Sequence, residues 1–254
     1  MSQHESAYPL GGQVAITTGA SSGLGRASAL ALAGAGADVA LLARTASDLE
    51  QVAAQVRSSG RRALPIAIDL ARESEILAAV ERVVAELGRV DILVNAAGTD
   101  VPGAIVELAV EDWDRVLAVN LRAPFLLARA ALPHMQRARH GTIVNVSSVA
   151  GKRGWANAAA YCASKFGLTG LTQALAAEAR QDGVRACIVY PGGMATSWGA
   201  WSAAEREAVA RAVAPTEALP PEDVAAFIVW LASAPSEVVV NEAVVTPLHE
   251  RGWP

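Results

Sequence analysis

The sequence predicts an α/β protein built on a doubly wound parallel sheet of about seven strands, with helices on both faces. Short apolar, β-branched runs alternate with helical stretches along the whole chain, and neither a linker nor an internal repeat interrupts them. The chain has 254 residues, of which 52% are hydrophobic and only 18% charged, as expected for a large buried core. We therefore predict a single domain over residues 1–254, with residues 1–11 flexible.

The first part of the chain has the pattern of a βαβ unit. A strand is expected at residues 13–18, and a second strand at 38–42. Between them lie the glycine-rich turn TGASSGLG, from Thr18 to Gly25, and an alanine- and leucine-rich helix that ends near Ala35. In such a unit, backbone N–H groups at the helix start can approach a pyrophosphate.

The same alternation continues to the end of the chain. Further strands are expected at residues 61–68, 91–95, 142–146, 185–190 and 238–246. Helices are expected at residues 47–59, 73–87, 111–138 (with a break or bend at Pro124), from the Tyr161 region to about 181, and at 221–233. Ligands of doubly wound sheets bind at the carboxyl ends of the strands, where the glycine turn, Gly98, Ser148 and Pro191 all fall.

Tyr161, Lys165 and Ser148 form a candidate catalytic group. Tyr161 and Lys165 are four residues apart in an alanine-rich run, so they should share one helix face. The chain contains only three tyrosines and two lysines, which makes a chance pair of this kind uncommon. A nearby cation lowers the pKa of a phenol, so we predict that Tyr161 is a general acid or base. Ser148 follows a buried strand and could donate a hydrogen bond to a developing oxyanion.

The end of the second strand carries an arginine where dinucleotide-binding proteins often have an acidic residue. That neighbourhood reads Leu42-Ala43-Arg44-Thr45, without a carboxylate to hold a ribose 2′-hydroxyl. Arg44 offers a cation for a 2′-phosphate instead. The alternative is an ordinary solvated loop arginine.

Composition and charge exclude several other classes of protein. The net charge is −4 with a pI of about 5.6, and no basic block is present, which argues against a nucleic-acid partner. The most apolar region, residues 27–43, is interrupted by glycines and Asp38, so we expect no membrane span. Cys162 and Cys187 lack metal-ligand spacing and are too few for a disulfide framework. With no visible secretory signal, we expect a cytoplasmic protein without a metal site.

Taken together, the motifs resemble the short-chain dehydrogenase/reductase family over residues 12–246. The matching positions, in family order and spacing, are the Thr18–Gly25 turn, Asp69, Asn95-Ala-Ala-Gly98, Asn120, Ser148, Tyr161 with Lys165, and Pro191-Gly-x-x-x-Thr196. The resemblance implies a Rossmann-type fold and a hydride transfer between a nicotinamide and a carbonyl or secondary alcohol substrate. Because Arg44 matches the NADP-preferring pattern, it implies NADP(H) rather than NAD(H).

The resemblance also implies a role for each catalytic position. Tyr161 would be the proton donor or acceptor, Lys165 would hold the nicotinamide ribose and lower the tyrosine pKa, and Ser148 would bind the substrate oxygen. Asn120 would support a proton-relay water, although it could instead satisfy backbone groups at a bend near Pro124. From the sequence itself, we expect Cys162, next to Tyr161, to be a small buried filler rather than a nucleophile, since no His lies nearby in sequence.

The cofactor positions follow from the same resemblance. Asp69 would face the adenine, Thr196 would hold the carboxamide, and Asn95 would either steady the central strand or contact the cofactor. The full candidate set is Gly19, Ser21, Ser22, Gly23, Leu24, Gly25, Arg44, Thr45, Asp69, Leu70, Asn95, Ala96, Gly98, Tyr161, Lys165, Pro191, Gly192 and Thr196.

The substrate is the least defined part of the prediction. Residues 197–220, with Trp198 and Trp201, are expected to form a lid over the nicotinamide. Apolar walls with Lys152 and Arg153 nearby suggest a medium-sized carbonyl compound, with an acid group as one option.

Two alternative functions stay open at this stage. One is a 3-oxoacyl reductase acting on a carrier-protein or CoA substrate, with Arg137 and Arg139 meeting an acidic carrier. The other is a non-catalytic NADP(H)-binding regulatory module. The chain end after Val238 departs from the segment that many tetrameric family members share, so both a homodimer and a homotetramer are considered.

Overall fold

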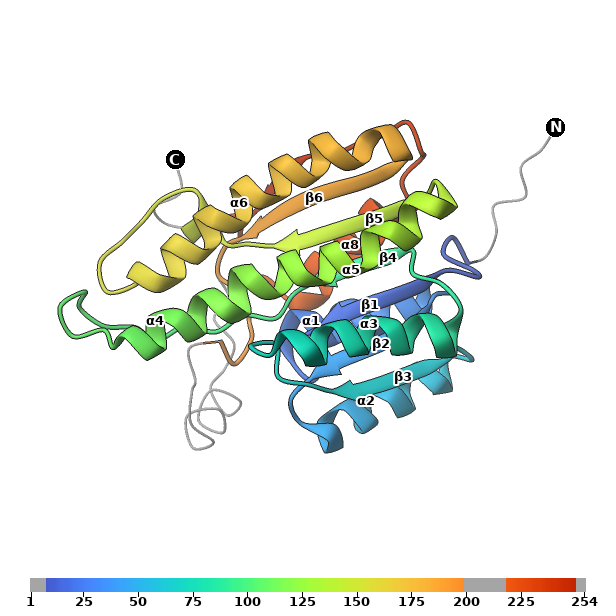
Figure 1. Cartoon of the computed structure of the whole chain (residues 1–254), viewed down its shortest axis with the longest axis horizontal. Coiled ribbons are helices and arrows are strands. Elements are labelled where there is room, and N and C mark those ends of the chain that lie inside the picture. Colours follow the sequence, from blue (N-terminus) through green and yellow to red (C-terminus); the bar gives the residue numbers. More distant parts are fainter. Residues whose placement is uncertain (1–7, 199–217, 250–254) are drawn as a thin grey trace.

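The computed structural model describes residues 8–198 and 218–249, which form a seven-stranded parallel sheet with helices on both faces (Figure 1). The strand order is β3-β2-β1-β4-β5-β6-β7, and every pairing is parallel. The strands are β1 (Val14–Thr18), β2 (Asp38–Ala43), β3 (Ala63–Ala67), β4 (Ile92–Asn95), β5 (Gly141–Val146), β6 (Val184–Pro191) and β7 (Glu242–Val245). The predicted fold class is confirmed.

The strand order places the functional edge of the sheet. The chain runs outward from β1 through β2 to β3 and then returns to β4 on the other side of β1. A ligand crevice is expected outside the carboxyl ends of the strands at such a reversal. The register aligns these ends, because Thr17 lies opposite Val94, and Val94 lies opposite Val144.

Each face of the sheet is covered by its own helical layer. Helices α1 (Gly23–Gly34), α2 (Ala46–Ser58) and α8 (Pro221–Ser233) cover one face, and α3 (Glu73–Leu87), α5 (Ala123–Ala138) and α6 (Ala159–Ala179) the other. The alternation of side chains along a strand separates the two cores: Ala15 packs under the first layer and Ile16 under the second. Both side chains are fully buried.

Helix boundaries agree closely with the sequence patterns that predicted them. Helix α3 ends at Gly88, whose φ of 91° is a left-handed conformation that glycine adopts without strain. Strand β7 is shorter than predicted and begins only at Glu242. Val238 donates its N–H to the Pro235 carbonyl in a turn at 2.9 Å, so this residue is not available to the sheet.

The long helical stretch before β5 contains a π-helical turn. Helix α4 (Val110–Leu117) passes into the π-helix η1 (Ala118–Arg122), which is followed by α5. The break predicted at Pro124 therefore lies one turn earlier. Pro124 has no N–H to donate to the Asn120 carbonyl, and this missing bond accounts for a wider turn just before it.

This stretch, Val110–Ala138, is also the one helical segment among the described residues that is long and apolar enough to cross a bilayer by length and composition. Half of its most apolar window is buried inside the protein. Its α5 part packs against α3 and forms part of the core under the second layer. Burial of this kind is typical of a core helix.

Candidate active site

A cavity of about 590 Å³ lies at the carboxyl edge of the sheet, where the sequence places the site. It is open from the glycine turn after β1 to the start of α6. Sixteen further residues of the predicted set line it together with Tyr161 and Lys165: Gly19, Ser21, Ser22, Gly23, Leu24, Gly25, Arg44, Thr45, Asp69, Leu70, Ala96, Gly98, Ser148, Pro191, Gly192 and Thr196. Asn95 and Asn120 are not among the residues that line it.

The glycine turn brings bare backbone to one end of the cavity. Gly19 and Gly23 have φ values of +66° and +51°, which favour glycine. A Cβ on Gly25 would lie 2.3 Å from the Gly19 carbonyl oxygen, so the first turn of α1 packs against the end of β1 with no room for a side chain. The Ser22 backbone is extended immediately before the helix. The first N–H groups of a helix lack partners within the helix, and this geometry places those of α1 beside the cavity.

Thr18 fixes the loop that follows β4. Its hydroxyl oxygen accepts the N–H groups of Ala96 and Ala97, both at 3.0 Å. This contact joins the two strands on either side of the chain reversal and holds the Ala96–Gly98 wall of the cavity. Thr18 was predicted only as the start of the glycine motif, because its contact with the loop after β4 depends on the tertiary structure.

Asn95 lies behind the cavity, in a buried chain of polar side chains. Its Nδ2 donates to Asn145 Oδ1 at 2.8 Å, and Asn145 Nδ2 donates to Thr172 Oγ1 at 2.8 Å. This series of side-chain hydrogen bonds runs from β4 through β5 to α6, under the second helical layer. Its contacts match the structural alternative for Asn95, which is to steady the central strands.

Asn120, in the π-turn η1, holds the loop next to the cavity. Its Oδ1 accepts the Thr99 N–H at 2.8 Å, and its Nδ2 donates to the Thr99 carbonyl at 2.8 Å. Nδ2 also lies 3.1 Å from Ser164 Oγ on α6. Because Thr99 lines the cavity, Asn120 shapes the wall from behind.

Tyr161, Lys165 and Ser148 meet at the other end of the cavity. Lys165 Nζ lies 5.6 Å from the centre of the Tyr161 ring and donates to the Val146 carbonyl at 2.9 Å. Tyr161 is 9% exposed and Lys165 only 3%. The Ser148 hydroxyl bonds the Tyr161 phenol and accepts the Ala150 N–H at 3.2 Å, which starts the short 3-10 turn η2 (Val149–Gly151).

Burial is the largest cause of the pKa shifts of both Tyr161 and Lys165. Loss of solvent raises the pKa of Tyr161 to about 12, and its hydrogen bond with Ser148 only partly opposes the shift. Burial likewise lowers the pKa of Lys165 to about 8. The net shift of the Tyr161 pKa in the protein alone is therefore upward, opposite in direction to the lowering expected from Lys165, because desolvation penalises the phenolate.

Charged side chains gather at the end of the cavity near β2 and β3. Arg44, Asp69 and Arg115 all line it, and Arg115 Nη1 lies 3.6 Å from Asp69 Oδ2. A bond from the Ala71 N–H lowers the Asp69 pKa most, with help from both arginines. Two guanidinium groups thus face one carboxylate. Arg115 was missed, because no local pattern places a residue of α4 beside the end of β3.

The segment after β6 closes the cavity over the tyrosine. Thr196 lies above the glycine turn, and the Trp198 ring packs at a tilt against Tyr161, with ring centres 5.5 Å apart. The ends of the predicted lid, residues 197–220, are tied together: Ala195 N–H donates to the Leu219 carbonyl at 2.8 Å, and Leu219 N–H to the Gly193 carbonyl at 2.9 Å. Most of this segment, including Trp201, lies outside the described residues.

The charged side chains near Tyr161 differ from those that the sequence predicts. Lys152 does not line the cavity and pairs with Glu242 on β7. Asp100, which the sequence analysis did not consider, is half-buried, and its charge helps to keep Tyr161 protonated. The bridge between Gly103 and Ala158 holds the Asp100 loop against the start of α6.

The described residues contain no group of three or more His, Cys, Asp or Glu side chains arranged to hold a metal ion. A second hollow, of about 690 Å³, lies on the outer side of α4, η1 and α5. It contains none of the predicted site residues, although Arg115 borders both cavities.

Comparison with known proteins identifies the family. The model of the short chain dehydrogenase family matches residues 13–207. The chain belongs to the short-chain dehydrogenase/reductase family. The matched residues include the glycine turn, Ser148, Tyr161 and Lys165.

Relatives from this family are similar over almost the whole chain. D-threitol dehydrogenase of Mycolicibacterium smegmatis is 39% identical over 228 residues, which cover 89% of this chain and 88% of that protein. Cis-4-hydroxycyclohexanecarboxylate dehydrogenase of Sinomonas cyclohexanicum is 39% identical over 231 residues, covering 90% and 92%. A crystal structure of a metagenomic short-chain oxidoreductase in complex with NADP has a TM-score of 0.82 and 37% identity, covering 95% of this chain and all of the other.

Proposed function

We propose that this protein is an NADP(H)-dependent oxidoreductase that interconverts a secondary alcohol and the corresponding carbonyl compound, with Tyr161 as the general acid or base. One observation carries the proposal: a single cavity joins a bare glycine turn at one end to Tyr161, Lys165 and Ser148 at the other. The first end suits a phosphate group, and the second suits a reacting oxygen atom.

The cavity fits a nicotinamide dinucleotide. The glycine turn leaves no space for a Cβ at Gly25, so backbone N–H groups can approach the pyrophosphate closely. Asp69 and Leu70 would border the adenine, and Thr196 would hold the nicotinamide end. When bound, the cofactor supplies or accepts the hydride.

Arg44 supports the choice of NADP(H) over NAD(H). It is exposed at the end of β2 and lines the cavity, whereas no carboxylate follows that strand before Thr45. A guanidinium can bind a 2′-phosphate with two charge-assisted hydrogen bonds. The related metagenomic oxidoreductase was crystallised with NADP, which agrees with this assignment.

The protonation of the site suits carbonyl reduction at neutral pH. With its pKa raised to about 12, Tyr161 carries a proton that it can donate to the developing alkoxide. Ser148 would donate a hydrogen bond to the same oxygen. Lys165 lies one turn after Tyr161 on α6. Its Nζ is held by a hydrogen bond to the Val146 carbonyl.

The walls near Tyr161 favour a medium-sized, neutral substrate. Trp198 and Trp155 both line the cavity, and Ser148 provides a hydroxyl. The Asp100 carboxylate does not line the cavity, but it acts on Tyr161 electrostatically and would disfavour an anion next to the phenol. The two relatives named above act, by their names, on hydroxyl-bearing compounds, which agrees with an alcohol or carbonyl substrate; one of these compounds also carries a carboxylate, so the relatives do not support the preference for a neutral substrate.

Neither alternative function gains support from the structure. Arg139 bonds Asp182 and the Gln181 carbonyl at the end of α5, next to the start of β5 and thus at the sheet edge opposite the cavity. Arg137 contacts His134. A carrier protein bound there would lie far from Tyr161. A module without turnover gives no reason for Tyr161, Lys165 and Ser148 to meet.

For the assembly we propose a homodimer or homotetramer. Large apolar side chains are about half exposed on two outer surfaces: Phe125 and Phe166 on α5 and α6, and Trp230 on α8. Such patches are typical of interfaces. Light scattering on the purified protein would determine the number of copies.

The function is tested by a screen of neutral ketones and secondary alcohols, followed through the absorbance of the reduced cofactor. NADPH and NADH are used in parallel, and Tyr161→Phe is the control. We expect turnover with NADPH on some neutral compounds, better than on matched carboxylates. Absence of any Tyr161-dependent turnover, together with tight NADPH binding, would favour the regulatory module instead.

A further inference from the structure

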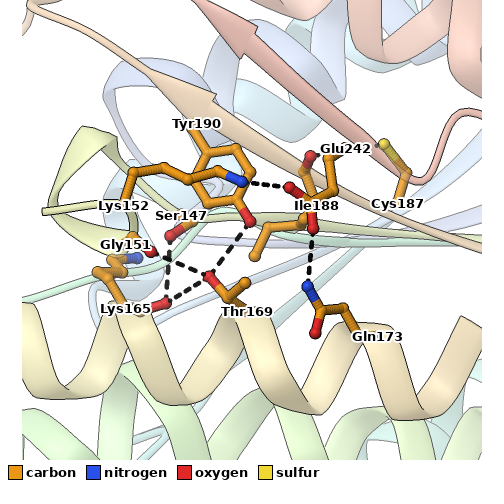
Figure 2. A network of polar contacts seen from close by, with 10 residues as sticks. All are labelled: Ser147, Gly151, Lys152, Lys165, Thr169, Gln173, Cys187, Ile188, Tyr190 and Glu242. Atoms are coloured by element: carbon orange, nitrogen blue, oxygen red, sulfur yellow. Dashed lines mark hydrogen bonds and ion pairs between the residues drawn. The ribbon is translucent and has the colours of Figure 1, made fainter. Parts of the chain in front are cut away.

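A group of polar side chains lies behind the active site, on the side of α6 that faces β6 and β7 (Figure 2). The Lys152 side chain extends from the end of η2 across the ring of Tyr190, with Nζ 4.3 Å from the ring centre. It ends in an ion pair with Glu242 on the edge strand β7. Gln173 on α6 donates to the other carboxylate oxygen at 2.8 Å. We call Lys152, Tyr190 and Glu242 the rear clamp.

The rear clamp is joined to the catalytic helix through Thr169. The fully buried Tyr190 donates its hydroxyl to Thr169 Oγ1 at 3.3 Å. The Thr169 hydroxyl in turn lies 3.0 Å from the Lys165 carbonyl and 3.4 Å from the Gly151 carbonyl (Figure 2). The contacts therefore reach the backbone of a catalytic residue and the backbone of the turn that begins at Ser148.

That turn is seated tightly against α6. A Cβ on Gly151 would lie 2.4 Å from Ser147 Oγ and 3.0 Å from the Lys165 carbonyl oxygen. The η2 turn thus has one close-packed position, and Lys152, the residue after it, is fastened from outside by Glu242. Ser148 is the N-cap of the same three-residue turn. Ser148 and Lys152 therefore flank the two ends of the same turn.

Stability alone is a weak reason for this arrangement. The side chains of Lys152 and Glu242 are 32% and 30% exposed, and ion pairs so close to solvent contribute little to folding. Each partner nevertheless favours the charged form of the other: the pair raises the Lys152 pKa and lowers that of Glu242. The clamp is therefore intact across the neutral range.

We propose that the rear clamp positions the Ser148 hydroxyl for the reaction, so that Lys152, Tyr190 and Glu242 act on turnover without touching the substrate. None of the three is among the described residues that line the active-site cavity. This inference rests on the proposed function, because it assigns the clamp to the step in which Ser148 binds the substrate oxygen. Displacement of a catalytic group by about 1 Å can cost about 100-fold in rate.

The test is a double-mutant cycle between the clamp and Ser148, measured as kcat and KM with NADPH. Lys152→Met removes the charge, Lys152→Arg keeps it, and Glu242→Gln keeps the shape of the carboxylate but removes its charge. Each is made alone and in a Ser148→Ala background. Arg82→Met is the matched control, because it removes a surface ion pair with Glu86 on α3, away from the site. Thermal unfolding and the NADPH dissociation constant are measured for every variant.

We expect Lys152→Met and Glu242→Gln each to lower kcat about 10- to 100-fold with NADPH affinity unchanged, and Lys152→Arg to restore most of it. In the Ser148→Ala background the same changes should have no further effect. If Lys152→Met does not fold, Glu242→Gln provides the test. A kcat equal to that of Arg82→Met, or losses that multiply with Ser148→Ala, would overturn the clamp while leaving the proposed function intact. If Ser148→Ala alone keeps wild-type kcat, the Ser148 part of the proposed function fails, and the clamp fails with it.

Discussion

The indole of Trp198 packs on the phenol ring of Tyr161, with ring centres 5.5 Å apart and planes inclined by 44°. The contact places a large apolar surface next to the proposed reacting oxygen. Trp198 is 47% exposed and lines the cavity, so it is in a position to contact a substrate.

We therefore expect Trp198→Ala to change substrate selectivity more than stability. The ratio of kcat/KM for a bulky and a small ketone should change by about 10-fold or more. Trp230→Ala is a matched control, since Trp230 is 48% exposed and stacks on Phe227 at 6.0 Å, but on α8. A stability loss of about 3–5 kcal/mol with unchanged selectivity, as for a buried core aromatic, would show that Trp198 is structural.

Cofactor choice should depend on Arg44 and not on its neighbour Arg115. Arg44→Ala should weaken NADPH binding by about 1.5–3 kcal/mol more than NADH binding, because a charge-assisted bond to the 2′-phosphate is lost. Arg115→Ala should affect both cofactors alike, since Arg115 pairs with Asp69. Titration calorimetry with both cofactors measures the difference. Equal losses for Arg44→Ala would show that Arg44 does not read the phosphate.

The close packing of the glycine turn predicts opposite effects on stability for two Gly→Ala changes in helix α1. Gly25→Ala places a Cβ 2.3 Å from a backbone oxygen and should cost about 1–3 kcal/mol of stability as well as cofactor affinity. Gly34, at the other end of α1, has open space around its Cα, so Gly34→Ala should be neutral or stabilise by up to about 1 kcal/mol. Urea unfolding of both variants gives the comparison. Equal changes in the free energy of unfolding would contradict the close packing of the glycine turn at Gly25.

The buried Lys165 should make stability depend on pH. Its pKa is lowered from 10.5 to about 8, so between these values the unfolded chain binds a proton that the folded protein does not. The free energy of unfolding of the wild type, relative to Lys165→Met, should therefore rise with pH from about 8 to 10.5, by at most about 1.4 kcal/mol per pH unit.

Comparing the two proteins isolates this contribution. Burial also raises the Cys187 pKa from 9.0 to about 12, which gives stability the opposite trend over a range that overlaps with that of Lys165, but this thiol is present in both proteins. Denaturant unfolding at several pH values measures the difference. A difference that is flat or falls with pH would show that Lys165 is charged in the folded protein over this range.

Local patterns were enough to predict most of the fold. The apolar spacing of residues 73–87 and the glycine at 88 determine helix α3 to the residue. The glycine turn could be predicted because the positive φ values of Gly19 and Gly23 depend on the residue type at those positions. By contrast, the π-turn over Ala118–Arg122 depends on the hydrogen bond that Pro124 cannot donate to the Asn120 carbonyl. Hydrophobic periodicity gives no sign of such a turn.

The parts of the site that sequence reasoning missed depend on tertiary contacts. Spacing placed Tyr161 beside Lys165, but only the folded protein shows that both are buried, and this burial reverses the expected shift of the tyrosine pKa. In the same way, Lys152 was expected near the substrate, whereas β7 supplies the carboxylate that draws it to the rear. Asp100 gave no signal, because its effect comes from the folding of its loop against α6.

The most direct test of the central claim is the turnover of Tyr161→Phe on a substrate that the wild type reduces with NADPH. This change removes one hydroxyl from a side chain that is 9% exposed and keeps the ring that packs on Trp198. Proton transfer by a positioned side chain contributes about 10²–10⁴-fold, so kcat should fall by at least about 100-fold while the NADPH dissociation constant stays within about twofold. A Tyr161→Phe enzyme that keeps wild-type kcat on such a substrate would contradict the proposal that Tyr161 is the acid or base.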